Sequence, residues 1–181
     1  MIHWFIAAKN IIPAGVYPEV FSIDFAALRA HYDTVLFDLD NTLLPYDNDE
    51  VTQEHTQLFE TLLTLDYKVM IVSNSGSDRV GGFAEAMRVP YVKSAKKPLK
   101  SGFHKALGMI KAEPSQTLFV GDQLMTDVWG SHRAGLTPLL VKAIKRKSER
   151  WYTKLNRRIE KKMLRKLSLT HPDVVREIEQ L

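Results

Sequence analysis

The feature that most constrains the fold is a regular alternation, from residue 34 onward, of short apolar segments with longer amphipathic ones. The short segments have the length of buried strands, and the longer ones show helical spacing, as when Leu58, Leu62 and Leu65 share one helix face. Strands separated by helices of this length form βαβ units, so we predict an α/β fold built on a doubly wound parallel sheet. The expected strands are 34–38, 68–73, 91–93, 117–121 and 138–142, and the expected helices are 51–65, 77–88, 98–110 and 125–134.

The chain of 181 residues is long enough for one domain with a substantial core, and no internal repeat divides it. We expect a single domain over 1–181, with its core at 34–142, an N-terminal apolar segment at 1–33 and a tail at 143–181. The apolar start, MIHWFIAAKNIIPAG, is too short to cross a bilayer and lacks the basic beginning of a signal peptide. The absence of cysteine excludes disulfides, thiolate metal sites and cysteine-dependent phosphatases. These features favour a cytoplasmic protein that can also associate with a membrane surface.

Polar side chains follow four of the expected strands, at the edge of a parallel sheet where α/β proteins place their ligands. The first pair, Asp38 and Asp40, lies two residues apart and therefore on one face. Two anions about 4 Å apart repel by roughly 4 kcal/mol at an effective dielectric of about 20, so a cation or a shared proton is expected between them. The later strand ends contribute groups that suit a phosphate and a metal ion: Ser73, Asn74, Lys97, Asp122 and Asp127.

Each of these residues also has an ordinary structural explanation. An aspartate after a strand often caps a helix or forms a turn, and Ser73 with Asn74 could do the same. Lys97 could be a solvated surface charge, and Asp127 could simply begin a helix. Taken together, these explanations do not account for the common position of all the residues at strand ends.

The four segments resemble the motifs of the haloacid dehalogenase (HAD) superfamily of aspartate-nucleophile phosphatases. DLDNTL at 38–43 matches the first motif, Ser73 in VSNS the second, Lys97 in KKP the third, and GDQLMTD at 121–127 the acidic fourth. Longer stretches, DLDNTLLPYD and VGDQLMTDVWGSHRAG, resemble the capless HAD-IIIA branch of the YqeG type, which is similar to mitochondrial phosphatidylglycerophosphate phosphatase. The resemblance implies a Rossmann-like HAD core without a cap domain.

The resemblance also implies roles for individual residues. Asp38 would be the nucleophile that forms an aspartyl-phosphate, and Asp40 would act as general acid and then as general base. Ser73, Asn74 and Lys97 would hold the phosphoryl oxygens, with Lys97 neutralising the charge of the transition state.

A Mg²⁺ cofactor follows from the same resemblance. The ion would be bound by the carboxylates of Asp38 and Asp122 and by the backbone carbonyl of Asp40, because Mg²⁺ prefers oxygen ligands. Asp127 would orient the metal's waters or Asp122 from outside the ligand set, and Thr42 would orient Asp40 or its loop.

The spacing of the motifs leaves no room for an inserted lid. Ser73 lies only 33 positions after Asp40, and Lys97 lies 24 positions after Ser73. An uncapped site is open, which favours a bulky or surface-borne phosphoester.

The tail has a charge opposite to that of the rest of the chain. Between Lys142 and Lys166 there are 12 Lys or Arg residues and two Glu residues, whereas the remainder carries 13 basic and 19 acidic residues. The segment Arg150–Leu167 has the pattern of a basic amphipathic helix. Such a helix could dock on the protein's own core, lie on an anionic membrane or meet nucleic acid. No nucleic-acid-binding motif is present, so no specific nucleic acid is expected.

The function predicted from these features is a Mg²⁺-dependent phosphomonoester hydrolase, acting on a phospholipid such as phosphatidylglycerophosphate. One alternative is a HAD phosphatase for a soluble nucleotide, sugar phosphate or phosphoprotein. The other is a non-enzymatic module that binds RNA or membranes through the basic tail. The sequence leaves the oligomeric state and the role of residues 168–181 open.

Overall fold

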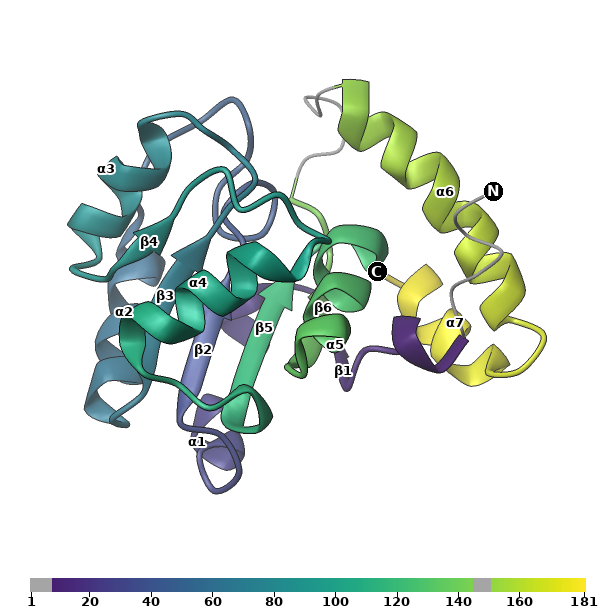
Figure 1. The fold of residues 1–181 in the computed structure, drawn as a ribbon, viewed down its shortest axis with the longest axis horizontal. Coiled ribbons are helices and arrows are strands. Elements are labelled where there is room, and N and C mark those ends of the chain that lie inside the picture. Colours follow the sequence, from purple (N-terminus) through teal and green to yellow (C-terminus); the bar gives the residue numbers. More distant parts are fainter. Residues whose placement is uncertain (1–7, 145–150) are drawn as a thin grey trace.

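A computed structural model describes residues 8–144 and 151–181, and only the backbone of Ala8 and of residues 151–158. Its centre is a six-stranded parallel sheet in the order β1-β6-β5-β2-β3-β4 (Figure 1). The predicted α/β class and parallel sheet are therefore confirmed. The strands are β1 Gly15–Tyr17, β2 Thr34–Phe37, β3 Lys68–Val72, β4 Tyr91–Val92, β5 Thr117–Gly121 and β6 Thr137–Val141.

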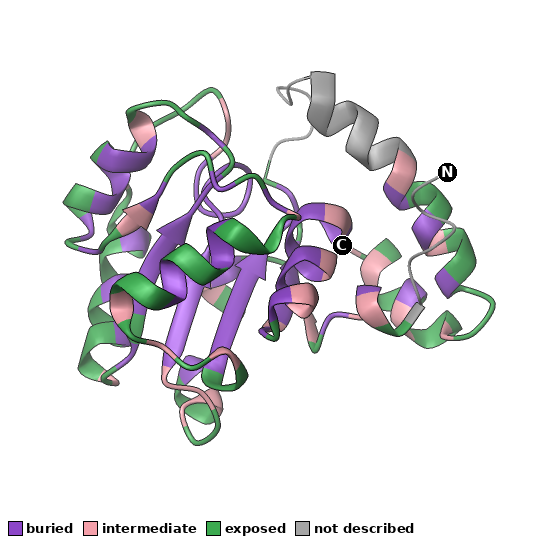
Figure 2. Ribbon diagram, in the orientation of Figure 1, coloured by how far each residue is buried: buried purple, intermediate pink, exposed green. Residues whose placement is uncertain are grey.

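Helices cover both faces of this sheet, which is why the central strands are apolar after their first, polar residue. One face packs against helices α1 Phe25–Leu28, α2 Gln53–Thr64 and α3 Arg79–Ala86. The other packs against α4 Lys100–Ile110 and the end of α5 Gly130–Ala134. Every residue of β2 is buried (Figure 2). Three short 3₁₀ turns lie among the described residues of the N-terminal segment and before β5: η2 Ala8–Ile11, η3 Val20–Ser22 and η4 Pro114–Gln116.

The helix predicted at 125–134 consists of two parts. Leu124–Trp129 forms a single-turn π-helix, η5, and α5 continues it from Gly130. Gly135 ends α5 in the left-handed conformation, with φ of 85°, as is typical of a helix C-terminus. A π-turn widens the helix locally, and such turns are frequent at functional sites.

The N-terminal segment contributes a strand that the sequence pattern did not reveal. β1 pairs in parallel with β6, with Gly15 beside Leu139 and Tyr17 beside Val141. Three residues are too few to show a periodic pattern, so the strand could not be recognised from the sequence. The described part of the segment 1–33 therefore adds a strand to the sheet, and it is more than an appendage.

The tail forms two helices, α6 Trp151–Leu167 and α7 Pro172–Glu179. Met163 and Leu167 of α6 are 1% and 0% exposed, and they pack with Val175 of α7 against Ile11, Leu124, Val128 and Leu140. The described part of the helix predicted at Arg150–Leu167 thus docks its apolar face on the protein itself. The prediction for Arg150 and for the side chains of residues 151–158 lies outside the described residues.

Between β2 and β3 the described chain holds a loop and α2, and between β3 and the Lys97 loop it holds α3 and β4. These connections match the prediction that no cap domain is inserted. Among the described residues, no helix combines the length and the apolar character needed to cross a membrane.

Candidate active site

The site lies at the carboxyl ends of the central strands, where β2 lies between β5 and β3 in the sheet. The backbone N–H of Asp38 donates to the carbonyl of Val120 at 2.9 Å, so Asp38 directly follows the last rung between β2 and β5. Asp122 lies at the end of β5, and Lys97 reaches in from the loop after β4. Side chains from three of the four predicted strand ends thus lie close together: Asp38 after β2, Lys97 after β4, and Asp122 with Asp127 after β5.

The ammonium group of Lys97 is the central cation of the site. Its Nζ lies 2.8 Å from Oδ1 of Asp38 and 2.8 Å from Oδ1 of Asp127, with the Phe119 ring centroid 4.9 Å away. Burial alone would lower the pKa of Lys97, but the carboxylates of Asp127 and Asp38 outweigh burial and raise that pKa above its ordinary value. Lys97 is therefore a permanent positive charge.

The carboxyl group of Asp38 has a strongly perturbed pKa, raised to about 7. Burial is the largest cause, Lys97 opposes it, and the nearby charges of Asp127 and Asp40 add to the increase. One ammonium group does not offset this concentration of negative charge. A buried carboxyl group with such a perturbed pKa is typical of a functional site.

Three carboxylates form a group that could hold a metal ion. One oxygen each from Asp38, Asp122 and Asp127 lies within 4.8 Å of the others, and all three residues are buried. Carboxylate oxygens are the ligands of hard divalent cations, so the donor set fits the metal that the motifs imply. Asp127, which the motif resemblance assigns to a position outside the ligand set, lies within this group and contacts Lys97.

The position of Asp127 depends on local backbone geometry. Its Oδ2 accepts a hydrogen bond from the backbone N–H of Gln123 at 3.0 Å, which ties the π-turn η5 to the end of β5. A Cβ atom on Gly121 would lie 2.5 Å from Cβ and Cγ of Asp127. Only glycine at position 121 therefore permits this close approach.

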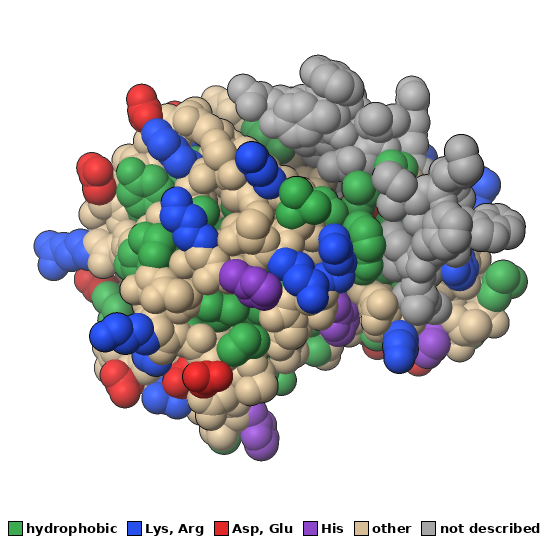
Figure 3. Space-filling model, viewed as in Figure 1, with side chains coloured by type: hydrophobic (Ala, Val, Ile, Leu, Met, Phe, Trp, Pro, Cys, Tyr) green, Lys and Arg blue, Asp and Glu red, His purple; other side chains and the backbone are tan. Residues whose placement is uncertain are grey.

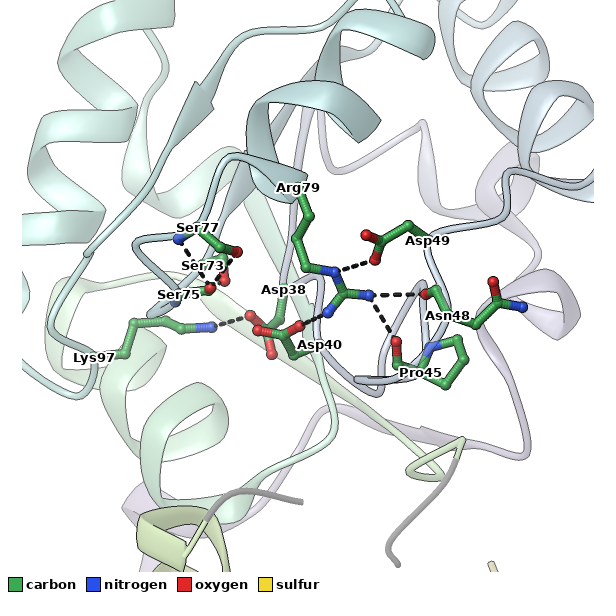
Figure 4. Close-up of polar contacts among 10 residues, drawn as sticks. All are labelled: Asp38, Asp40, Pro45, Asn48, Asp49, Ser73, Ser75, Ser77, Arg79 and Lys97. Atoms are coloured by element: carbon green, nitrogen blue, oxygen red, sulfur yellow. Dashed lines mark hydrogen bonds and ion pairs between the residues drawn. The ribbon is translucent and has the colours of Figure 1, made fainter. Parts of the chain in front are cut away.

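Asp40 has a cationic partner that the sequence analysis missed (Figure 4). Nη1 of Arg79, the first residue of α3, donates to Oδ1 of Asp40. The two carboxylates that follow β2 are thus held by different cations, Asp38 by Lys97 and Asp40 by Arg79. The sequence held one hint of this partner. Arg79 lies in the first turn of a helix, where the helix dipole disfavours a cation unless an anion lies nearby.

The remaining predicted residues make contacts that differ from the expected ones. Oδ1 of Asn74 accepts from the backbone N–H of Lys97 at 2.6 Å, and its Nδ2 donates to the Lys97 carbonyl at 3.0 Å. Asn74 therefore holds the backbone of Lys97 through both ends of its amide. Buried Ser73 uses Oγ to accept from the N–H of Ser75 at 3.0 Å. The buried Thr42 Oγ1 has no hydrogen-bond partner within the described chain, so its predicted contact with Asp40 is not seen.

A Rossmann-like sheet with buried aspartates and a lysine at its strand ends defines a class of phosphate-handling α/β enzymes. The HAD-hydrolase-like family model matches residues 94–158, which include Lys97, Asp122 and Asp127. Among curated proteins, "Probable phosphatase YqeG" of Bacillus subtilis is 34% identical over 157 residues, covering 86% of this chain and 91% of the relative.

Solved structures share the fold at lower identity. The cobalt-bound deoxy-D-mannose-octulosonate 8-phosphate phosphatase of Haemophilus influenzae superposes with a TM-score of 0.51 at 12% identity, covering 78% of this chain and 92% of that one. The magnesium-bound putative HAD-hydrolase YfnB of Bacillus subtilis gives 0.50 at 16% identity, covering 70% and 99%.

The chain belongs to the HAD superfamily of hydrolases and, within it, to the YqeG-type phosphatases. It is therefore a phosphatase that acts on a phosphorylated substrate, and the non-enzymatic alternative is not favoured.

Proposed function

We propose that this phosphatase uses Mg²⁺ and an aspartyl-phosphate on Asp38 to hydrolyse the phosphomonoester of an anionic phospholipid. The observation that supports the chemistry is the buried cluster of Asp38, Asp122 and Asp127, in which the Lys97 ammonium contacts both Asp38 and Asp127. In this proposal the cluster would supply the nucleophile, a fixed cation and the donors for a divalent metal.

In the first half-reaction, a carboxylate oxygen of Asp38 attacks phosphorus and the bond from phosphorus to the leaving oxygen breaks. The leaving oxygen takes a proton from Asp40, while Lys97 neutralises charge on the phosphoryl oxygens. Asp38, Asp122 and Asp127 would hold Mg²⁺, with the Asp40 backbone carbonyl as a further ligand. Bound Mg²⁺ would supply Lewis-acid stabilisation of phosphoryl charge.

In the second half-reaction, water attacks phosphorus and gives its proton to Asp40. The bond between phosphorus and Asp38 breaks, which releases inorganic phosphate and restores the carboxylate. Asp40 is then protonated again, ready for the next leaving group.

The nucleophile is tested with Asp38→Asn and an aryl phosphate substrate. We expect activity to fall by more than about a thousandfold with the fold intact by circular dichroism. In Asp40→Asn, the aryl phosphate should still phosphorylate Asp38 because its leaving group needs little protonation, and the phosphoenzyme should accumulate in intact-mass spectra. Asp66→Asn, which changes an exposed aspartate, is the matched control. Full activity in Asp38→Asn would refute the assignment.

A lipid substrate is supported by the surface beside the site. Leu99, two residues after Lys97, is 52% exposed, and Ile144, whose N–H donates to the Asn41 carbonyl at 3.0 Å, is 50% exposed. Exposed lysines accompany them: Lys96, Lys100 and Lys142. Figure 3 shows Lys and Arg side chains among hydrophobic ones on the face that carries α4. Apolar groups among cations suit an anionic amphiphile better than a small polar phosphoester.

The tail supports the same proposal through charge. Lys161, Lys162, Arg165 and Lys166 of α6 are exposed, whereas Met163 and Leu167 are buried in the protein. Each basic residue near an anionic membrane contributes about 1 kcal/mol to attraction. Contact through this half of α6 would therefore be electrostatic, without insertion of its buried apolar face.

The substrate is tested by comparing phosphate release from phosphatidylglycerophosphate in vesicles with release from soluble nucleotides, sugar phosphates and phosphopeptides. We expect kcat/KM to be at least about tenfold higher for the lipid. Equal or greater activity on one soluble class would replace the lipid proposal with that class and leave the Asp38 chemistry unaffected.

A further inference from the structure

Arg79 joins three separate segments of the chain around Asp40 (Figure 4). From the start of α3, its Nη1 donates to Asp40 and its Nε donates to Asp49. Its Nη2 donates to the carbonyls of Pro45, at 2.6 Å, and Asn48, at 3.0 Å. One guanidinium group thus holds the end of β2 and the loop 45–49 in a fixed relation.

This set of contacts requires arginine. Four acceptors in different directions match the planar fork of the guanidinium group, whereas a lysine ammonium could satisfy only part of the set. The Arg79 side chain is 12% exposed and that of Asp40 is 9% exposed, so solvent screens their ion pair only weakly. Removing the Arg79 charge would weaken the stabilisation of a carboxylate that is largely buried.

Asp40 cannot serve as acid and base unless one of its oxygens is held at the leaving group. The structure fixes Asp40 Oδ1 on Arg79, which limits the carboxylate to one orientation. Asp38, by contrast, is held by Lys97, so the two carboxylates have separate supports. A change at position 79 should therefore affect proton transfer through Asp40 more than attack by Asp38.

We propose that Arg79 is a positioning residue for the acid–base carboxylate of Asp40, holding it and the 45–49 loop in the arrangement needed to protonate the leaving group. This inference rests on the proposed role of Asp40. Arg79 acts through Asp40 and through the loop, and it is not itself assigned to the phosphoryl group.

The test compares two leaving groups in the full-length protein with saturating Mg²⁺. An alkyl phosphate such as glycerol phosphate needs protonation of its leaving oxygen, whereas p-nitrophenyl phosphate does not. For Arg79→Gln we expect kcat/KM, which reports phosphoryl transfer to Asp38 and departure of the leaving group, to fall about 30-fold on the alkyl substrate and about threefold on the aryl one, a partial loss of the roughly 100- to 10,000-fold that general-acid catalysis supplies. Arg79→Lys, which keeps a charge beside Asp40, should show a smaller loss on the alkyl substrate.

Arg29→Gln is the matched control, because Arg29 also binds two backbone carbonyls, of Leu65 at 2.7 Å and Asp66 at 3.3 Å, away from the site. It should leave the alkyl-to-aryl ratio unchanged. The double variant Asp40→Asn/Arg79→Gln should have the same ratio as Asp40→Asn, since Arg79 acts through Asp40.

The results distinguish a failure of the proposed role of Arg79 from a failure of the proposed acid–base role of Asp40. Equal losses on both substrates in Arg79→Gln and Arg79→Lys, alongside a selective loss in Asp40→Asn, would overturn the role of Arg79 alone. An unselective loss in Asp40→Asn would instead overturn the acid–base assignment of Asp40. If Arg79→Gln does not fold, the ratio in Arg79→Lys decides the question.

Discussion

At the scale of single residues, the site is organised by which cation faces which carboxylate. Repulsion between Asp38 and Asp40 predicted a cation between them, but the structure gives each its own partner, Lys97 and Arg79. Lys97 could be found from the sequence because it follows a strand. Arg79 begins α3, six residues after Ser73, and its place in the first helical turn indicates that an anion is near but not which one, because no local pattern specifies the path of the 45–49 loop.

The raised pKa of Asp38 predicts a pH dependence of metal binding. The folded, metal-free protein retains a proton on Asp38 up to about pH 7, whereas the unfolded chain loses it near 3.8. The resulting stabilisation is therefore complete below about pH 4 and is lost as pH rises through about 7. Mg²⁺ must displace that proton, so Mg²⁺ should raise the Tm more at pH 8 than at pH 6. Calorimetry with and without Mg²⁺ checks this, and an equal Tm increase at both values would contradict it.

A pair of glycine substitutions tests the close approach at the end of β5. Gly121→Ala should lower the free energy of unfolding by about 2 kcal/mol and weaken Mg²⁺ binding, because its Cβ would displace Asp127. Gly108→Ala, in α4, meets nothing within 4 Å and should raise stability by about 0.5–1 kcal/mol. Urea unfolding and Mg²⁺ titration measure both effects. Unchanged Mg²⁺ affinity in Gly121→Ala would show that Asp127 is not needed for the ion.

At the scale of elements, the predictable parts were those with a long, regular pattern. Strands β2, β3 and β5 and helices α2 and α4 follow from apolar periodicity, and together they place the strand ends of the site. β1, with three residues, and the π-turn η5, with its irregular spacing, have no such pattern. The contact of Asn74 with the Lys97 backbone was not foreseen for a related reason, since it depends on how the fold brings the loop after β4 to its amide.

The docking of α6 gives a prediction at the same scale. Leu167 is fully buried against the domain, so Leu167→Ala should destabilise the protein by about 2–4 kcal/mol. Leu169, two residues further on, is 84% exposed, and Leu169→Ala should change the unfolding free energy by less than about 0.5 kcal/mol. Urea denaturation distinguishes the two. Equal, small effects would mean that α6 does not pack on the core in solution.

At the scale of the whole molecule, acidic and basic groups occupy different places. The carboxylates of the candidate site are buried at the strand ends, whereas basic residues of the tail are exposed on α6, which suits the proposed division between catalysis and membrane recruitment. Glu160 links the two parts, because its Oε1 accepts from the N–H of Met125 in η5 at 3.1 Å. The tail is thus joined to the turn that carries Asp127 and still presents its cations outward.

This arrangement predicts that salt acts on the two functions differently. The Debye length falls from about 10 Å at 0.1 M salt to about 3 Å at 1 M, so attraction between α6 and anionic vesicles should weaken steeply. The buried Lys97 pairs are screened much less, and turnover of a soluble aryl phosphate should change by less than about twofold. Replacing Lys161, Lys162, Arg165 and Lys166 by Gln should reduce vesicle binding at low salt in the same way. Vesicle co-sedimentation and aryl phosphatase assays across one salt series check this, and salt-independent binding would indicate insertion of apolar groups instead.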